Sequence, residues 1–261
     1  MARLVKSPQL RQVLAFCAED PVERVFLEDV ARRGLGRYVG LEAGGRVVAL
    51  CHMGANLVPS GRDTAAFAGL ASRSRPRMIV GEERAVTELW EAIRGRMPEP
   101  LDDRPLQPVY VTREAPPPGG SGLREATLAD LPILVPACGA AYYEEVGVDA
   151  HARDPALSEW RTRSQIESGR SWLWEEAGQI RFKAEASAWT EGVVQLQQVW
   201  VEPALRGRGY ARQALADLLR LLLARTPTVC LFVRPENEPA IRLYESLGMR
   251  QTSTYRSLIF A

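Results

Sequence analysis

Residues 199–215 read VWVEPALRGRGYARQAL: an apolar, strand-like run, a turn with two glycines and two arginines, and the start of a helix. Glycine is about 1 kcal/mol less favourable than alanine in a helix interior, so two of them at a helix entry indicate that the bare backbone has a role there. The N-terminus of a helix carries unpaired N–H groups and a partial positive charge. Glycines let an oxyanion approach these groups without a clashing Cβ, and Arg206 and Arg208 would add charged contacts. The turn at 206–211 is therefore a candidate pyrophosphate site.

The hexapeptide RGRGYA has a second interpretation, a tight turn whose small residues serve packing alone. Two other phosphate-binding motifs are excluded. A Walker loop needs G-x-x-x-x-G-K-[ST], and the turn contains no lysine. A dinucleotide fingerprint needs G-x-G-x-x-G, but Arg212 stands where the third glycine would be. The neighbouring elements therefore decide between the two interpretations.

The rest of the second half alternates strand and helix patterns around this turn. The run IRFKAEASAW (180–189) alternates apolar and polar side chains, so one face of this strand would be apolar and the other, with Lys183 and Glu185, polar. Strands are predicted at 123–126, 171–176, 180–189, 193–201, 228–233 and 251–260, and helices after Thr127, from 211 onward and at 239–248. This order predicts an α/β (α+β) fold with a mixed, mostly antiparallel sheet flanked by helices.

The run REAPPPGGSG at 113–122 offers few side chains to bury and predicts a linker, semi-rigid and then flexible, between residues 1–112 and 123–261. The first half is predicted to be a smaller α/β domain of related layout, with helix, hairpin, strand, helix and strand at 18–34, 37–54, 77–81, 82–95 and 106–111. It lacks an R-x-x-G-x-A segment, because LASRSRPR (70–77) stands in that place. An internal duplication with a degenerate first copy is one interpretation of this layout.

The bulk composition excludes several classes of protein. With 261 residues, of which 46% are hydrophobic and 25% charged, the chain has the composition of an average globular protein. Its net charge of +1 indicates neither nucleic acid nor an anionic membrane as a partner. The four cysteines are scattered and only two histidines accompany them, so we expect reduced thiols and no metal site. Residues 1–20 are too polar for a signal peptide and no apolar run reaches a membrane-spanning length, so we expect a cytoplasmic protein.

Two motifs together resemble the GNAT superfamily of acyl-CoA-dependent N-acetyltransferases. VWVEPALRGRGYARQAL is similar to that family's strand, R/Q-x-x-G-x-G/A turn and helix. VRPENEPAIRLYESLGM (233–249) is similar to its N-x-x-A-x-x-L-Y-x-x-x-G-F signature, with Asn237, Ala240, Leu243, Tyr244 and Gly248 in register and Met249 in place of the phenylalanine. The resemblance covers 121–261 and implies a GNAT-like fold there. The whole chain also resembles a subgroup in which an uncharacterised first domain precedes the GNAT domain. In this chain that first domain would be the degenerate GNAT-like copy.

The resemblance implies acetyl-CoA as the co-substrate and gives each motif a role. Residues 199–201 would hold the pantetheine arm, the turn would hold the pyrophosphate, and Asn237 would form a hydrogen bond with the coenzyme. Cofactor binding is thus expected at Val199, Trp200, Val201, Arg206, Gly207, Arg208, Gly209, Tyr210, Ala211 and Asn237. Tyr244 would lie beside the thioester sulfur. Outside this register, Asn237 would be an ordinary N-cap residue and Tyr244 a half-buried helix aromatic.

The expected chemistry is attack of a primary amine on the acetyl thioester, with coenzyme A leaving as a thiolate. Tyr244 is the candidate general acid for that thiolate, because a phenol with a pKa of about 10 can lend it a proton. An amine of lysine type would also need a base, and the candidates are Glu185, Glu144 and Glu145. The competing interpretation of each carboxylate, and the one that we favour from the sequence, is an ordinary solvated surface group.

The segment AYYEEVGVDA (141–150) occupies the place where the family's variable helical region lines the acceptor pocket. Tyr142, Tyr143 and Glu144 would bind a cationic amine there through ring faces and charge. The acceptor could be a small molecule or a peptide, and no pattern indicates which, or an oligomeric state. The competing hypothesis is a regulatory module that binds acyl-CoA without turnover.

Overall fold

The computed structural model describes residues 2–147 and 150–260, and the strands in these ranges form one sheet in the order β1-β2-β3-β4-β5-β12-β6-β11-β10-β9-β8-β7. The first half contributes β1 (Arg3–Lys6), β2 (Tyr38–Ala43), β3 (Arg46–Met53), β4 (Asn56–Gly61), β5 (Met78–Glu82) and β6 (Asp102–Thr112). The second half contributes β7 (Arg124–Glu125), β8 (Ser171–Glu176), β9 (Gln179–Trp189), β10 (Val194–Trp200), β11 (Val229–Phe232) and β12 (Arg250–Ile259).

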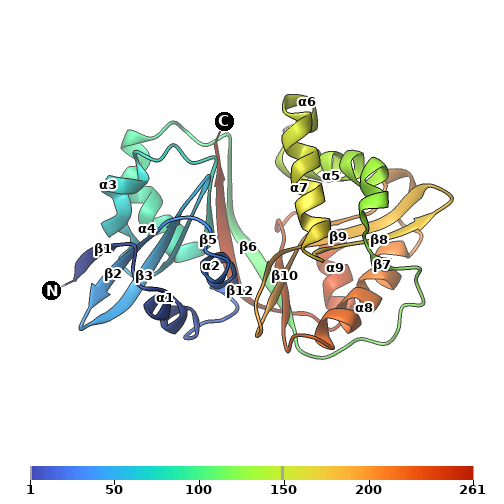
Figure 1. The fold of residues 1–261 in the computed structure, drawn as a ribbon, viewed down its shortest axis with the longest axis horizontal. Helices are drawn as coiled ribbons and strands as arrows, with labels where there is room; N and C mark the ends of the chain where they lie inside the picture. The colour runs from blue at the N-terminus through green and yellow to red at the C-terminus, as the bar shows by residue number, and fades with distance from the viewer. Residues whose placement is uncertain (1, 148–149, 261) are drawn as a thin grey trace.

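Helices flank this sheet (Figure 1). They are α1 (Leu10–Cys17), α2 (Val25–Arg32), α3 (Ala68–Ala71), α4 (Glu83–Ile93), α5 (Leu131–Val146), α6 (Ala150–Arg153), α7 (Pro155–Glu167), α8 (Tyr210–Leu223) and α9 (Glu238–Ser246). Short 3₁₀ turns are η1 (Thr64–Phe67), η2 (Arg94–Arg96), η3 (Leu128–Asp130) and η4 (Pro203–Leu205).

The central strands are exchanged between the two halves of the chain. β6, from the first half, pairs antiparallel with β11 and β12 of the second half, and β12 also pairs with β5 of the first half. Figure 1 shows β6 in green and β12 in red side by side at the centre of the sheet. Because an unpaired strand edge leaves backbone N–H and C=O groups without partners, each half depends on the other to complete its sheet.

The helices of the second half cover both faces of its strands. On one face α8 and α9 pack against apolar side chains such as Phe182 and Leu196. On the other face α5 and α7 pack against Leu173 and Ile180. From the first half, α2 adds Val25 to a cluster at the centre of the sheet. The strands of the second half therefore lie between two packed layers of helices.

The predicted fold class, a mixed and mostly antiparallel sheet flanked by helices, is confirmed. The later strands and helices of the second half begin and end within about two residues of their predicted bounds. The strand predicted at 123–126 is shorter, since only Arg124–Glu125 pair with β8. The helix predicted at 18–34 is wrong at its start: residues 18–24 form turns around Pro21, which has no N–H to donate, and α2 begins at Val25.

The segment 113–122, expected to be flexible in its glycine-rich part, is held against α8. The Asp217 carboxylate accepts hydrogen bonds from the backbone N–H groups of Gly119 and Ser121, both at 2.7 Å, and from the Ser121 hydroxyl at 2.6 Å. Arg220 donates to the Pro116 carbonyl at 2.9 Å. The segment forms no helix or strand, yet these bonds fix its path, so its glycine content alone overstated its freedom.

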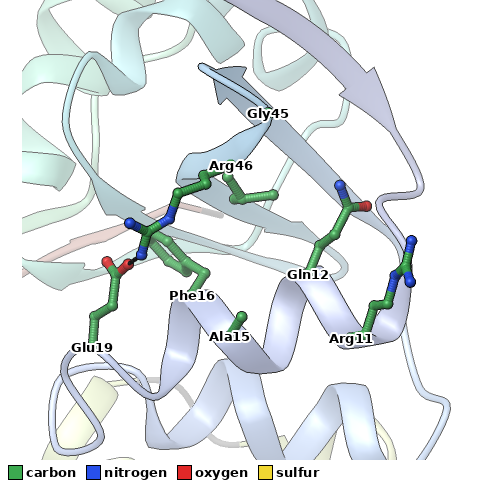
Figure 2. A pocket seen from close by; sticks show the side chains of 8 residues that line it. Arg11, Gln12, Ala15, Phe16, Glu19, Gly45 and Arg46 are labelled. Carbon is green, nitrogen blue, oxygen red and sulfur yellow. Dashed lines mark hydrogen bonds and ion pairs between the residues drawn. The ribbon is translucent and has the colours of Figure 1, made fainter.

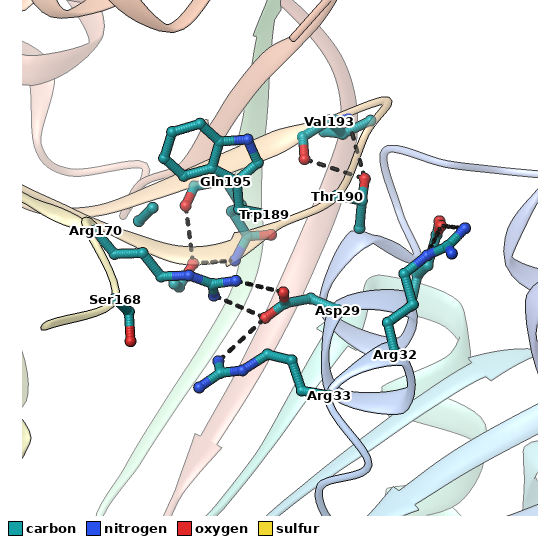
Figure 3. Close-up of polar contacts among 12 residues, drawn as sticks. Asp29, Arg32, Arg33, Ser168, Arg170, Trp189, Thr190, Val193 and Gln195 are labelled. Carbon is teal, nitrogen blue, oxygen red and sulfur yellow. Dashed lines mark hydrogen bonds and ion pairs between the residues drawn. The ribbon is translucent and has the colours of Figure 1, made fainter. Parts of the chain in front are cut away.

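A buried ion pair joins the two halves on the α2 side of the sheet. Arg170, just before β8, donates two hydrogen bonds to the Asp29 carboxylate of α2, at 2.8 and 2.6 Å. Arg33 approaches the same carboxylate at 3.5 Å (Figure 3). Asp29 is only 2% exposed, so its charge depends on these partners.

Replacing Asp29 with alanine would leave the Arg170 guanidinium without its counter-charge. Removing one partner of a buried ion pair costs about 3–5 kcal/mol, so urea denaturation of Asp29→Ala should show a fall of roughly that size in the free energy of unfolding. Glu238→Ala removes an exposed pair with Arg242 and should cost at most about 1 kcal/mol. Equal losses in the two variants would contradict the structural role of Asp29.

Candidate active site

The sheet of the second half opens where β10 and β11 diverge. These parallel strands pair only through Val194–Val229 and Gln195–Cys230, and β10 then continues to Trp200 beside β9. On the β11 side, residues 196–200 have no strand partner in the described ranges. An extended ligand can hydrogen-bond to such an edge as an added strand would.

The glycine turn lies at the end of this opening. The chain leaves β10, makes η4 and enters α8 through Gly207 and Gly209, whose φ angles of 75° and 85° are readily adopted only by glycine. The first hydrogen bond of α8 runs from the Gln213 N–H to the Gly209 carbonyl at 3.1 Å, so the N–H groups of residues 210–212 precede the helical ladder. Apart from its chain neighbours, no atom lies within 4 Å of a Cβ built on Gly207. The turn thus offers bare amides with room for an anion.

The two arginines of the turn behave differently. Arg206 donates from Nε to the Val201 carbonyl at 3.1 Å, and its Nη2 lies 2.6 Å from Glu144 Oε2. The other oxygen of Glu144 accepts from Trp200 Nε1 at 3.1 Å. Arg208 is exposed and forms no ion pair with a described residue. Glu144, which we expected at the acceptor site, therefore links the end of α5 to the predicted coenzyme site.

β10 contains a bulge inside the opening. Gln197 pairs with Glu185 and Trp200 with Lys183, so Gln198 and its successor lie opposite a single residue of β9. Gln198 has a φ of 49°, a left-handed conformation that costs a residue with a side chain about 1–3 kcal/mol. Such strained positions cluster at functional sites, where the surrounding structure holds them. No glycine marks this position, so the sequence contains no signal for it.

The polar face predicted for 180–189 is buried, not solvated. α5 covers it, and Lys183 and Glu185 are 0% and 5% exposed. Lys183 Nζ lies 2.9 Å from Glu185 Oε1, 2.6 Å from Gln198 Oε1 and 3.0 Å from Cys138 Sγ. The alternative of Glu185 as a surface carboxylate is therefore wrong. Alternation along a strand shows which residues share a face but not which helix will cover that face.

The charges of this buried pair support each other. Burial alone would raise the pKa of the Glu185 carboxyl, but the Lys183 ammonium outweighs it and holds that pKa below its ordinary value. Burial would lower the pKa of Lys183, but Glu185 and Cys138 raise it above its ordinary value. Both groups therefore stay charged at neutral pH. A carboxylate held in this way is a weak proton acceptor, which counts against Glu185 as a general base.

Tyr244 of α9 lies in the core beside the opening. Its ring is 5% exposed and packs near Tyr110, with 5.9 Å between the ring centroids. Burial, and then the nearby charge of Glu145, raise the pKa of the Tyr244 hydroxyl above its ordinary value. The phenol therefore keeps its proton through the neutral range. Asn237 lies at the start of the same helix, where its Oδ1 accepts from the Ala240 N–H at 3.3 Å as an N-cap.

The C-terminal end of α5 bridges the ends of the two diverging strands. Glu144 contacts Trp200 at the end of β10, and Arg234, which follows β11, donates to the main-chain carbonyls of Glu144, at 2.8 Å, and Glu145. Arg104 of β6 also donates to the Glu145 carbonyl, at 2.6 Å. The Glu145 side chain reaches solvent, but the protein around its carboxyl group raises the pKa of that group, with Arg104 and Arg234 opposing.

A groove of about 780 Å³ lies beside this end of α5. Its walls are residues 102–106 from the first half and residues 234–237 with Pro239 from the second half. Leu106 is exposed in the groove wall, with a φ of 55° and its N–H bonded to Glu83 Oε2 at 2.7 Å. Of the residues predicted for the acceptor, Tyr142 is partly buried and Tyr143 is exposed on α5, whereas Val148 and Asp149 lie outside the described residues.

The first half repeats the strand layout but not the opening. β4 and β5 also pair in parallel through two residue pairs, Asn56–Met78 and Leu57–Ile79. Beyond them the Pro59 carbonyl lies within 2.9 Å of where a Cβ on Gly81 would sit, so the strands stay close. The counterpart of the glycine turn follows β4 at the start of η1, and not at 70–77 as predicted; there the Thr64 N–H donates to Glu88 Oε2 at 3.1 Å. A side-chain carboxylate of the protein thus occupies the place that a bound anion would take.

A separate recess of about 340 Å³ lies on the first half, between α1 and the β2–β3 turn (Figure 2). The Arg46–Glu19 ion pair, at 2.8 Å, crosses one side of it, and Arg11 and Gln12 line the other. None of the residues predicted for catalysis or binding lines this recess.

Within residues 2–147 and 150–260, no three His, Cys, Asp or Glu side chains gather in an arrangement that could hold a metal ion. None of the helices described is both long enough and apolar enough to cross a lipid bilayer.

Comparison with solved structures shows the same fold. A GNAT-family acetyltransferase from Colwellia psychrerythraea is 12% identical, with a TM-score of 0.61 and 99% of this chain and 100% of that chain covered. A GCN5-related N-acetyltransferase from Sphaerobacter thermophilus is 17% identical, with a TM-score of 0.60 and coverage of 98% and 95%. A tandem GNAT protein from the clavulanic acid biosynthesis pathway is 12% identical, with a TM-score of 0.58 and coverage of 99% and 98%.

Two family models match consecutive stretches of the chain. Residues 36–134 match a domain of unknown function (DUF4081), and residues 140–249 match the Acetyltransferase (GNAT) family. No curated protein matches the chain. The matched residues 140–249 contain the β10–β11 opening, the glycine turn and Tyr244. Residues 140–249 therefore form a domain of the GNAT acetyltransferase family, and this domain follows a stretch that matches a domain of unknown function.

Proposed function

We propose that the protein transfers the acetyl group of acetyl-CoA to a primary amine of a small molecule or peptide, by direct attack of the amine on the thioester. The observation that carries this proposal is the divergence of β10 and β11 directly ahead of the glycine turn. An unpaired strand edge and a helix N-terminus then lie in sequence along one path. They match the amide-rich pantetheine arm and the pyrophosphate of coenzyme A in that order.

The coenzyme would bind along this path. The amides of Gly207 to Arg212 would hold the pyrophosphate, and the β10 edge at 199–201 would hydrogen-bond to the pantetheine. Asn237 uses its Oδ1 as a helix cap, so its amide nitrogen would donate to the coenzyme. Arg206 would either keep its pair with Glu144 or exchange it for a phosphate oxygen.

Tyr244 would be the general acid. It is the buried phenol beside the opening, and its raised pKa keeps it protonated when the thioester is attacked. The departing thiolate would form in the same apolar surroundings. Because burial disfavours charge on sulfur as it does on oxygen, the proton affinity of the thiolate would rise as well, so transfer from Tyr244 stays feasible.

Glu145 is the better candidate base. Its carboxyl group has a raised pKa, which suits a proton acceptor working near neutral pH, and its charge is close enough to contribute to the raised pKa of Tyr244. Glu185, in contrast, is held in its pair with Lys183. The groove beside Glu145 would admit the acceptor, with residues 102–106 of the first half in its wall.

The first half would then serve the active site without binding coenzyme itself. Arg104 holds the Glu145 main chain from β6, and β6 completes the catalytic sheet. The counterpart of the glycine turn is closed by Glu88. Two domains separated at 113–122, one accessory and one catalytic, remain our proposal for the organisation of the chain.

Replacing Gly209 with alanine should weaken coenzyme A binding about tenfold by calorimetry. An alanine would let the free turn relax from the φ of 85°, and binding would have to restore that backbone at a cost of about 1–2 kcal/mol, where 1.4 kcal/mol is a factor of ten. Gly192→Ala is the matched control, because Gly192 lies in a turn with no atom within 4 Å of an added Cβ and no positive φ. It should bind coenzyme A as the wild type does. Equal affinities in both variants would contradict the role of the turn.

Tyr244→Phe should lower kcat by roughly 10²- to 10⁴-fold while leaving coenzyme A affinity unchanged, since it removes only the proton donor. The measurement is thiol release from acetyl-CoA with a panel of amines. Tyr110→Phe, which removes the neighbouring hydroxyl bonded to Glu245, should keep most of the activity. Unchanged turnover by Tyr244→Phe would show that the acid is another group, and no turnover by the wild type with any amine would favour a non-catalytic acyl-CoA sensor.

Activity should fall as the pH drops through the pKa of Glu145, because the base must be ionised to accept a proton. This pKa lies above the ordinary value of 4.5. Glu145→Gln should remove this limb from the profile of kcat/KM against pH and lower the plateau about 10²-fold or more. Glu159→Gln, a change to an exposed carboxylate of α7, should keep the limb. A limb that persists in Glu145→Gln would assign the base to another residue.

A further inference from the structure

We propose that Lys183 is a positioning residue for this reaction: it holds the β10 bulge in the conformation that presents backbone N–H groups to the thioester carbonyl. The inference rests on the proposed function and extends it to a residue that contacts neither substrate.

Lys183 has a complete set of hydrogen-bond partners. An ammonium group carries three protons and accepts none. Its Nζ lies within 3.0 Å of three acceptors on three different elements: Glu185 Oε1 on β9, Gln198 Oε1 on β10 and Cys138 Sγ on α5. Because the side chain is fully buried, water cannot replace any of these partners. The lysine therefore fixes the position of Gln198 relative to both neighbours.

The bulge turns two consecutive side chains toward this one charge pair. Gln198 accepts from Lys183 Nζ at 2.6 Å, and Gln197 Nε2 donates to Glu185 Oε2 at 3.2 Å. Successive residues of a regular strand point to opposite faces, so both glutamines can reach the same pair only while the strand is bulged. The left-handed Gln198 supplies that bulge. The ion pair and the strained backbone thus require each other.

The bulge lies where the thioester would. It follows the last rung between β10 and β11 at Gln195 and precedes the residues proposed to hold the pantetheine, 199–201. A bulge leaves an extra residue out of the ladder with β9, so its N–H can turn toward the opening. Donors aimed at the developing oxyanion are effective only when they are held in place beforehand. Lys183 would provide that hold from the far side of the strand.

A purely structural role would not explain the choice of residues. A buried ion pair is weak evidence for stability, because well-packed apolar residues of similar volume often do as well or better. What the pair adds here is a fixed geometry at two adjacent residues of β10. The test must therefore separate geometry at the thioester from folding and from coenzyme binding in general.

The first experiment compares the affinities of acetyl-CoA and coenzyme A, whose difference reports on the thioester carbonyl. The double variant Lys183→Met with Glu185→Leu removes the pair without leaving a lone buried charge, so it should fold. We expect it to bind coenzyme A as the wild type does, to lose the preference for acetyl-CoA, and to lose roughly 10²-fold in kcat, as misplacement of a catalytic group does. The matched control is the double variant Arg170→Met with Asp29→Leu, which removes another buried pair without leaving a lone buried charge and should keep both the preference and the kcat.

The second experiment separates the side chain of Gln198 from its backbone conformation in two single variants. Gln198→Gly and Gln198→Ala both remove the amide that Lys183 holds, but glycine adopts the left-handed region freely and alanine does not. Gln198→Gly should therefore keep more of the acetyl-CoA preference and of kcat than Gln198→Ala.

Two results would overturn the inference: an unchanged acetyl-CoA preference in the Lys183→Met, Glu185→Leu variant, or equal behaviour of Gln198→Gly and Gln198→Ala. A loss of coenzyme A binding by the double variant would also overturn it, because Lys183 would then support the whole site. Failure of the proposed function is a different outcome, since the wild type itself would then bind neither acetyl-CoA nor coenzyme A.

Discussion

The proposed coenzyme site depends on one constraint: β10 and β11 diverge after two pairs of residues. A parallel pair within a sheet normally continues until one strand ends, because each unpaired backbone group that is kept from water is costly. Here β10 runs on to Trp200 with one edge free, while β11 stays paired with β6, which lies on its other edge. The glycine turn, Tyr244 and the end of α5 all lie around this opening. A ligand with its own amide groups would satisfy the free edge.

The parting is maintained from both faces of the sheet. On the α5 side, the Lys183–Glu185 pair holds the bulge, and Glu144 ties the end of α5 to Trp200 and Arg206. On the α9 side, Tyr244 packs near Tyr110 of β6. β6 belongs to the first half, so the strand exchange gives that half a structural part in the catalytic sheet. The first half has a parallel pair of its own, β4 and β5, but these strands do not diverge, and the Pro59 carbonyl lies close to Gly81.

Local patterns predicted most of the second half. The turn and the start of α8 follow from glycine chemistry, and the β9 strand follows from alternation. Several elements escaped prediction for physical reasons. β4 contains Pro59, which argues against a strand, and α7 has little apolar periodicity. α1 does carry an amphipathic spacing at Val13, Phe16 and Cys17 that could have identified it.

The remaining features of the site arise from contacts between distant residues. The exchange of β6 and β12 depends on which strands pair with each other, and alternation within one strand does not encode its pairing partners. The burial of Lys183 depends on which helix covers β9, and the bulge at Gln198 is stabilised by that lysine and not by a local glycine signal. The end of α5 becomes part of the site only because Arg104 and Arg234 hold it there.

The central claim is that coenzyme A lies in the β10–β11 opening of the second half and nowhere on the first. Amide hydrogen exchange, followed by mass spectrometry with and without coenzyme A, tests it most directly. The account predicts slower exchange in peptides that cover 196–201 and 207–212, and no change in the counterpart at 58–64. Protection at 58–64 instead, or no protection in any peptide at saturating coenzyme A, would contradict it.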